Sequence, residues 1–510
     1  MLQSCHNHEP NPDKNISMNY YQRLRNDDYA LNSHRIRGWI DSLIRNDQDS
    51  MMPDYRTREY YVNHNPFLWI DRHGIDGRAD TLLGYLQELP KEGFSRKKFR
   101  VGQIEKDLKR IRNLDFQGSD NRINMVMARL EYNLTKAYLR YVSGQRFGFL
   151  NPDVVFNHHD SIIEKDHPAV YRTLYNIPTD HNGMQFIHYA LDMISKDSLS
   201  SFFHKIQPKS HLYYQLYACL QKPGLNFYQR KVIMCNMERC RWRMHDYPQR
   251  YSKYILVNIP SLHLKAVDNN QVLTMRVGLG ALDTKTPLLY SKINKMDVNP
   301  QWILPKSIVK KSILHLLGNF HYFYSRHFFV RDRKTGKEVK WNRVTRDMLM
   351  SNDYLVIQEG GEGNSLGRII FRFPNNFSIY LHDTNFKDVF QQDVRDVSHG
   401  CIRVEKPFDL AVFLLKDKNQ AIINKIIYSM SADVSSLGHH EWNDKIIGGN
   451  GKGKDTLDRS RLIGSLSVSP QIPVFIVYYT LYPDHNGHLH EYKDLYGYDD
   501  LIYEILKNYM

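Results

Sequence analysis

One stretch of the chain combines the residue types that a nucleophilic cysteine needs. The sequence SHGC at 398–401 follows His382, and Arg403 lies just beyond it. A cysteine reacts as its thiolate, and a nearby imidazole either lowers the thiol pKa or removes its proton. A glycine beside the nucleophile permits a tight turn, which brings backbone N–H groups close to a reacting carbonyl. The pattern predicts Cys401 as the nucleophile and His382 as its base.

The same residue types also suit a zinc site. Two histidines and a cysteine would need a fourth ligand or a water, and Asp383 can supply that ligand. Against zinc, Gly400 stands where a donor amide is wanted. Arg403 shares one side of a strand with Cys401, so it can reach an anionic group beside the nucleophile. These features favour a nucleophile over a metal ligand, and the polar neighbours disfavour a buried structural cysteine.

The elements around this stretch read as strands and turns. LGRIIFRF, a turn at 374–376 and FSIYLHDT predict a β-hairpin whose second strand ends at His382. CIRV predicts a strand directly after the Gly400 turn. KPFDLAVFLLKD predicts a helix with Pro407 in its first turn.

The chain changes its hydrophobic period near its middle. Apolar residues recur at helical spacing in the first half, which contains no motif with evident chemistry, so we expect a scaffold there. The second half has short β-branched segments separated by turn residues. The predicted fold class is α+β: an all-helical N-terminal scaffold domain followed by a mostly β catalytic domain with two insertions. Helices are predicted at 35–44, 79–86, 101–114, 123–142, 169–175, 184–194 and 211–221. The expected domains are a polar N-terminal segment at 1–60, the scaffold at 61–249 and the catalytic domain at 250–510, with an insertion at 318–357 and a loop-rich insertion at 417–468.

The composition restricts the partners and the compartment. The 510 residues are 42% hydrophobic, which excludes wholesale disorder, and the net charge is +14. A basic protein prefers an anionic partner, and nucleic acid, an acidic membrane face and an acidic wall polymer all qualify. No nucleic-acid-binding module is recognisable. Five scattered cysteines are too few for a disulfide scaffold, and no apolar run is long enough for a transmembrane helix.

Two short motifs have alternative readings. Leu2-Gln3-Ser4-Cys5 has the shape of a bacterial lipobox, which makes Cys5 a candidate lipid anchor, although no apolar signal core accompanies it. The alternative is an ordinary tail. The glycine-rich loop from Gly448 to Lys454 has the spacing of a phosphate-binding loop, but Asp455 replaces the serine or threonine that would hold magnesium. A phosphate site is therefore not expected.

The catalytic stretch resembles the signature of L,D-transpeptidases with a YkuD-type catalytic domain, in which a histidine precedes Ser/Thr-His-Gly-Cys. The resemblance extends to NMERCRW, YILVNIP, VNPQWILPKSI, GNSLGRIIFRFPN, PVFIVYYT and DLYGYDD, which look like the long, YcbB-like branch. It covers 230–500 closely and 65–150 loosely. Cys240 stands where the family has a tryptophan. The stretch between LYACLQK and NMER is too short for the branch's peptidoglycan-binding module, so this chain is expected to lack that module.

The resemblance implies a β-sandwich in which the insertion at 318–357 is a capping subdomain over the active site. It also implies a cysteine-dependent acyl transfer that forms 3–3 cross-links between peptidoglycan stem peptides. Cys401 would attack the carbonyl between the third and fourth residues of a tetrapeptide stem, release D-Ala and form a thioester. His382 would carry the protons, and no cofactor or metal would be needed. The supporting residues would be backbone N–H groups of His399, Gly400 and Cys401 for the oxyanion, Arg403 and Tyr380 for orientation, and Ser398 for the turn and the His399 ring.

Several alternatives remain open at this point. Water in place of the acceptor amine would make an L,D-carboxypeptidase, and a protein amine would make an anchoring transferase. A non-catalytic wall-binding scaffold is the alternative from a different class. The expected location is the periplasm or cell envelope, and the resemblance also implies carbapenem-type inhibitors.

Overall fold

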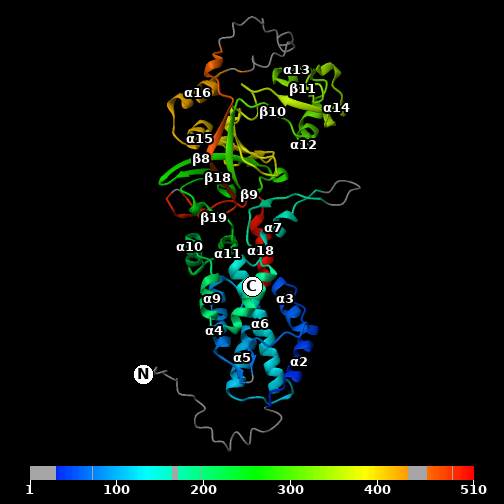
Figure 1. Cartoon of the computed structure of the whole chain (residues 1–510), viewed down its shortest axis with the longest axis vertical. Coiled ribbons are helices and arrows are strands. Elements are labelled where there is room, and N and C mark those ends of the chain that lie inside the picture. The colour runs from blue at the N-terminus through cyan, green and yellow to red at the C-terminus, as the bar shows by residue number, and fades with distance from the viewer. Residues whose placement is uncertain are drawn as a thin grey trace, which may run out of the picture. The chain divides into compact units, whose positions relative to one another are not determined.

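The computed structural model describes residues 30–71, 73–162, 170–196, 198–432, 434, 457–484 and 486–510. Cys5 and the loop from Gly448 to Lys454 lie outside these residues. The chain forms two compact units that alternate along the sequence (Figure 1). The helical unit comprises Met1–Asn151, Thr179–Arg243 and Asp499–Met510, and the β-rich unit comprises Pro152–Pro178 and Met244–Tyr498. The domain limits expected from the sequence stay predictions.

The helical unit is built around the long helix α6 (Ile123–Phe147), to which α2, α3 and α5 pack (Figure 1). Nearly all of α6 is buried, including charged residues. Burying a charge costs free energy unless it is paired, and Arg140 of α6 is paired, with its Nε atom 2.7 Å from the Asp54 carboxylate. The helices of this unit are α2 (Ser33–Asn46), α3 (Met52–Val62), α4 (Gly77–Gln87), α5 (Val101–Arg112), α6, α8 (Met184–Ser195), α9 (Leu199–Ile206), α10 (His211–Leu220), α11 (Phe227–Arg241) and α18 (Tyr498–Leu506), with the 3-10 turn η2 (Leu89–Glu92) and the short strands β1 (Ile70–Asp71) and β2 (Gly74–Ile75).

Six of the predicted helical segments are helices, and the one at 169–175 is wrong. That segment holds β4 (Val170–Tyr171) and the first residue of β5 (Tyr175–Asn176). Strand β5 pairs in parallel with β9, and β4 pairs with β3 (Ser161–Ile162). Pairing with distant strands overrides the local helical spacing here, which is a common outcome for short segments.

The β-rich unit contains a sheet of ten strands, eight of which close into a ring. The ring runs in the order β14-β15-β17-β8-β7-β6-β18-β9 and closes because β9 also pairs with β14. Of the remaining two strands, β5 pairs with β9 and β16 pairs with β8. The α+β fold class is confirmed, and the sheet is a closed, barrel-like one. Its strands are β6 (Lys253–Asn258), β7 (His263–Asp268), β8 (Gln271–Gly280), β9 (Leu288–Val298), β14 (Ile369–Arg372), β15 (Leu381–His382), β16 (Asp396–Ser398), β17 (Ile402–Val404) and β18 (Ser465–Val477).

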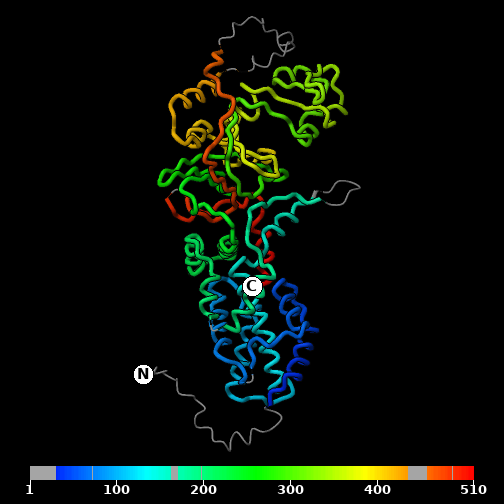
Figure 2. Tube along the Cα trace, in the orientation of Figure 1, coloured from blue at the N-terminus to red at the C-terminus, as the bar shows by residue number. Residues whose placement is uncertain are grey.

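Strand β9 allows the ring to close. It pairs along one edge with β18 and along the other with β5 and then β14. Figure 2 shows β18, which comes late in the chain and is drawn in orange to red, beside the green β9. A closed sheet leaves few free strand edges and surrounds an apolar core.

The predicted hairpin is confirmed. Strands β14 and β15 are antiparallel, with Ile370 opposite His382 and Phe371 opposite Leu381. The strand after the Gly400 turn is β17. The predicted helix is α15 (Pro407–Leu414), with Pro407 in its first turn. The segment 417–468 includes α16 (Gln420–Ser431), and β18 begins at Ser465.

A second, smaller sheet lies in the same unit and has the order β10-β13-β11-β12. It has its own hydrophobic core, in which Trp341 stacks on Phe323 at a ring separation of 3.8 Å. The buried residues of this core run from Leu304 to Val356. Its elements are β10 (Trp302–Ile303), α12 (Lys306–Ile308), α13 (Phe320–Ser325), β11 (Phe328–Asp332), β12 (Glu338–Val339), α14 (Arg346–Met350) and β13 (Tyr354–Gln358).

Candidate active site

Two parallel strands of the barrel bring the predicted nucleophile and base to one place. In the pairing of β15 with β17, Leu381 lies opposite Ile402 and His382 lies opposite Arg403. Leu381 and Ile402 are completely buried. Since side chains alternate between the two faces of a strand, the residues on either side share the opposite face. That face carries Tyr380, His382, Cys401 and Arg403.

His382 is a buried, neutral imidazole. Its Nδ1 atom contacts the carbonyl oxygen of Asp383, so the neutral ring carries its proton on Nδ1 and leaves the electron pair on Nε2. Burial lowers the pKa of His382 to about 4, and the positive charge of Arg403 acts in the same direction. The Asp383 carbonyl opposes this shift without reversing it. At neutral pH the ring can therefore accept a proton at Nε2.

Cys401 is partly exposed as a residue, while protein atoms surround its sulfur. Burial raises the pKa of the Cys401 thiol to about 11, against smaller opposing effects of the Tyr380 backbone and Arg403. Within the described residues, no hydrogen bond joins the sulfur to the His382 ring. The site therefore pairs a neutral thiol with a neutral base, and a thiolate–imidazolium ion pair is not formed in the free protein.

These pKa shifts predict a steep pH dependence of thiol reactivity. Only the thiolate is alkylated, so labelling of Cys401 by iodoacetamide should rise about tenfold per pH unit from pH 7 toward pH 10. The measurement is the labelling rate of the Cys401 peptide by mass spectrometry, with the Cys401→Ala protein as the control for labelling at the other cysteines. A rate that is flat across this range would contradict a neutral thiol.

The turn that carries the cysteine is held by Ser398 and requires glycine. Gly400 has φ +113°, a left-handed region that side chains rarely adopt. The Ser398 hydroxyl donates to the carbonyl oxygen of Cys401 (2.6 Å) and accepts from the Gly400 N–H (3.1 Å). The Gly400 N–H is thus already used inside the turn. Among the described residues, no hydrogen bond occupies the N–H groups of His399 and Cys401, which leaves them available as donors.

A second layer of residues supports this turn, and no motif near the turn indicates these residues directly. The Thr286 hydroxyl donates to the Gly400 carbonyl (2.9 Å) and accepts from the Gly280 N–H (2.9 Å). The Tyr496 hydroxyl accepts from the Thr286 N–H and donates to the Gly280 carbonyl (2.7 Å). Thr284 donates to the Ser398 carbonyl. Tyr496 lies in DLYGYDD, one of the segments that carried the family resemblance, and this was the one available signal.

Thr286→Val should loosen the turn. The substitution keeps the shape of the side chain and leaves two buried backbone groups without a partner, at a cost of about 1–3 kcal/mol in the free energy of unfolding. Thr284→Val is the matched control, because the Ser398 carbonyl keeps a second donor, the Ala281 N–H at 3.0 Å. Urea unfolding of both variants measures the difference. Equal destabilisation of the two would contradict this support.

The two histidines of the motif lie in different environments. His399 is exposed, and burial on one side together with Lys311 lowers its pKa, while Asp283 opposes that effect. Lys311 and Asp283 form an ion pair at 2.6 Å. No contact joins the His399 ring to Ser398 within the described residues. Ser398 therefore contacts the turn and not the ring.

Arg403 and Tyr380 line the same face as the nucleophile. The Arg403 guanidinium lies 6.0 Å from the Phe386 ring, and its buried Nε atom has no hydrogen-bond partner among the described residues. The positive charge of Arg403 acts on the thiol, so an anionic group at this face of the barrel would be attracted to it. The Tyr380 ring lies 6.0 Å from the His382 ring, and burial raises the pKa of its hydroxyl.

The alternative zinc site would need the Asp383 carboxylate. That carboxylate accepts from the Arg368 N–H (2.8 Å) and forms an ion pair with Lys387. In the part of the chain that the structure describes, no three histidine, cysteine, aspartate or glutamate residues lie together as a metal site. No helix in the same part is long and apolar enough to cross a membrane.

Comparison with known proteins matches both halves of the chain. Residues 252–423 match the model of the YkuD family, described as the L,D-transpeptidase catalytic domain, and residues 55–220 match the model of the Scaffold domain. The chain therefore contains a YkuD-type L,D-transpeptidase catalytic domain, preceded by a Scaffold domain. Its catalytic domain is that of an enzyme, and the match contains the complete SHGC motif and His382.

A curated relative supports the assignment. A Haemophilus influenzae protein named "Putative L,D-transpeptidase" is 25% identical over 332 residues, which are 63% of this chain and 60% of that protein. The chain therefore spans about 60% of the length of the curated relative it matches.

Solved structures of transpeptidases overlap only in part. An L,D-transpeptidase from Mycobacterium smegmatis is 13% identical, with a TM-score of 0.17, and covers 32% of this chain and 53% of its own. A structure titled as the avibactam carbamoyl enzyme of Ldtfm is 12% identical, with a TM-score of 0.21, and covers 34% and 50%. Scores this low add nothing to the assignment.

Proposed function

We propose that this chain forms 3–3 cross-links between peptidoglycan stem peptides through a thioester on Cys401. One observation carries the proposal. Within a YkuD-type catalytic domain, parallel strands hold Cys401 and His382 on one face of the barrel, above a glycine turn with free N–H donors. The chemical requirements for a nucleophile, a base and an oxyanion site are met by adjacent residues.

The first half of the reaction acylates the cysteine. The Cys401 sulfur attacks the carbonyl carbon between the third and fourth residues of a tetrapeptide stem, while His382 takes the thiol proton on Nε2. The carbonyl oxygen becomes an oxyanion that the N–H groups of His399 and Cys401 stabilise. The C–N bond then breaks, and His382 returns the proton to the leaving D-Ala amine. Gly400 serves by its conformation, since its own N–H donates to Ser398.

The second half transfers the acyl group. The amine of the third residue of a neighbouring stem attacks the thioester, and His382 takes the proton that this amine releases. The C–S bond breaks and the sulfur leaves with a proton from His382, which restores the neutral pair. Arg403 orients a carboxylate of the stem through its positive charge, and Tyr380 supports the His382 ring.

The acceptor decides between related activities. Resolution by water gives an L,D-carboxypeptidase, and resolution by a protein amine gives an anchoring transferase. Incubation with disaccharide tetrapeptides, followed by mass spectrometry of the products, separates them: cross-linked dimers support transfer, and tripeptides alone support hydrolysis. Absence of D-Ala release would favour a non-catalytic wall-binding scaffold.

This function implies further partners and a location. The substrate lies outside the cytoplasmic membrane, so we propose the periplasm or cell envelope, with Cys5 as a possible point of lipid attachment. A carbapenem would acylate Cys401, because its strained lactam presents a carbonyl to the same sulfur. We also propose 61–249 as the scaffold domain, 250–510 as the catalytic domain and 318–357 as a cap over the substrate. Nucleic acid is not proposed as a partner.

A further inference from the structure

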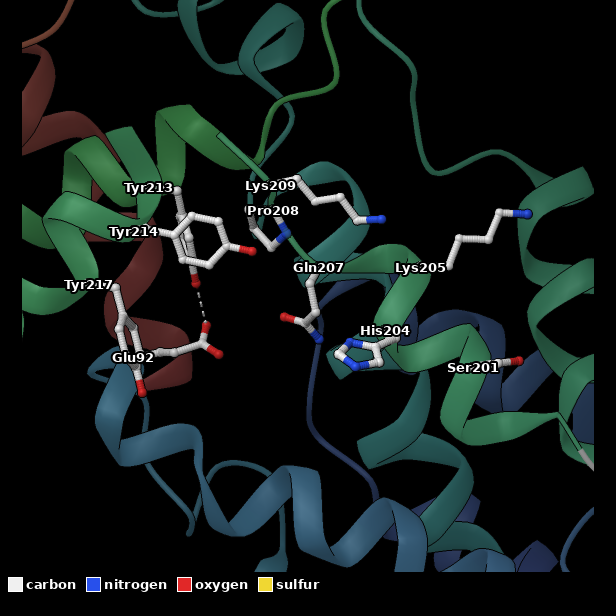
Figure 3. Close-up of a pocket in the computed structure, with 10 residues that line it drawn as sticks. All are labelled: Glu92, Ser201, His204, Lys205, Gln207, Pro208, Lys209, Tyr213, Tyr214 and Tyr217. Carbon is white, nitrogen blue, oxygen red and sulfur yellow. Dashed lines mark hydrogen bonds between the residues drawn. The ribbon is translucent and has the colours of Figure 1, made fainter. Parts of the chain in front are cut away.

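The helical unit contains a cavity that the proposed chemistry does not use. Its volume is about 670 Å³, within the range of pockets that take small ligands. Figure 3 shows it between α9 on one side and α10 with the η2 turn on the other. It is lined by Glu92, Ser201, His204, Lys205, Gln207, Pro208, Lys209, Tyr213, Tyr214 and Tyr217.

Tyrosine rings form one wall of the cavity. Tyr213 is buried, and its hydroxyl donates to the Glu92 carboxylate (3.1 Å), as the dashed line in Figure 3 marks. Tyr214 is 56% exposed, so its ring is offered to a ligand at little cost. Tyr217 lines the same wall. Flat rings that carry hydroxyls provide apolar faces together with polar edges.

Two residues that line the cavity have hydrogen-bond acceptor atoms without a partner among the described residues. Oxygen Oε2 of Glu92 accepts from Gln145, Tyr213 and Arg241, and the Arg241 contact is 2.7 Å long. Oxygen Oε1 of Glu92 has no partner among the described residues. Gln207 donates through Nε2 to the Tyr141 hydroxyl (2.8 Å), which leaves its own Oε1 open. A fixed carboxylate oxygen and a fixed amide oxygen therefore face the cavity.

The opposite wall supplies donors. Ser201, His204 and Lys205 lie on the exposed face of α9, while Phe202, Phe203 and Ile206 of the same helix are buried. Lys209 follows on the loop to α10. This wall presents one hydroxyl, one imidazole and two ammonium groups. The cavity thus combines ring faces, oriented acceptors and mobile donors.

We propose that this cavity binds the glycan strand of the wall polymer. Sugar rings have C–H faces that stack on tyrosine and edges of hydroxyl and N-acetyl groups that need both donors and acceptors. The cavity offers all of these. The proposal rests on the proposed function, which supplies a substrate whose stem peptide is attached to such a strand.

The test uses the full-length Cys401→Ala protein and glycan strands from which the stem peptides have been removed. Calorimetry should show binding, and Tyr214→Ala and Tyr217→Ala should each weaken it by about tenfold or more. Tyr55→Ala is the matched control, because Tyr55 is 64% exposed on α3 in the same unit and does not line the cavity. It should leave the affinity unchanged.

Three results would overturn the proposal: no binding of the strands, binding that all three substitutions leave equal, or tyrosine-dependent binding of the free tetrapeptide in place of the glycan. Circular dichroism of each variant checks that it is folded. Acylation of wild-type Cys401 by the tetrapeptide alone is measured in parallel. That reaction reports on the proposed function independently, because it needs no sugar.

Discussion

Replacing Cys401 with serine will reduce formation of the acyl-enzyme by about 10⁴-fold or more. The reason is the weakness of the base. A His382 imidazole with a pKa near 4 can take a proton from a thiol but is poorly matched to the far less acidic serine hydroxyl. The change also removes the intrinsic nucleophilicity of sulfur. Release of D-Ala from a tetrapeptide stem measures the rate.

Cys401→Ala is the control for residual activity of the oxyanion site, and we expect the serine variant to lie close to it. The two variants should unfold in urea near the wild-type midpoint, because they leave in place the hydrogen bond that the Ser398 hydroxyl donates to the Cys401 carbonyl oxygen. A serine variant that keeps activity within about tenfold of wild type would indicate a stronger base than the buried His382 provides.

Replacing His382 with alanine will slow acylation at pH 7 by about 10²–10⁴-fold. Without the base, attack depends on the small fraction of thiolate, since burial raises the pKa of Cys401 to about 11. That fraction grows as the pH rises, so the defect should shrink steadily between pH 7 and pH 10. The pH–rate profiles of the two proteins measure this convergence.

His399→Ala is the matched histidine control, because His399 is exposed and, in the proposed mechanism, only its backbone N–H takes part. The His399→Ala substitution should slow acylation by less than about tenfold, because changes to exposed side chains have small effects. A His399→Ala defect as large as that of His382→Ala would reverse the roles proposed for the two histidines. A His382→Ala defect that stays constant with pH would contradict a neutral thiol.

Elements formed by residues that are close together in sequence could be predicted, because turns and strand ends depend on the local sequence. The hairpin that ends at His382, the strand after Gly400 and the helix that begins at Pro407 were all readable from residue order. In contrast, Thr286 and Tyr496 support the turn from positions far away in the sequence. Such support depends on which strands become neighbours, and no local pattern encodes it.

Burial and long-range pairing explain the other differences. The closure of the sheet depends on β9 pairing with β14 and β18, which lie far downstream. The segment at 169–175 has helical spacing but pairs as strands. The pKa values of His382 and Cys401 come from burial, so the motif indicated the reacting atoms but not their protonation. The helical half looked like a plain scaffold because the tyrosines of its cavity follow ordinary helical spacing.

The most direct test of the account is intact-protein mass spectrometry of the wild-type chain mixed with a tetrapeptide stem and no acceptor. The account predicts an adduct with the mass of the tetrapeptide less D-Ala, located on the Cys401 peptide after digestion, and removed when an amine acceptor is added. An adduct on any other residue, or release of D-Ala without an adduct on Cys401, would contradict it.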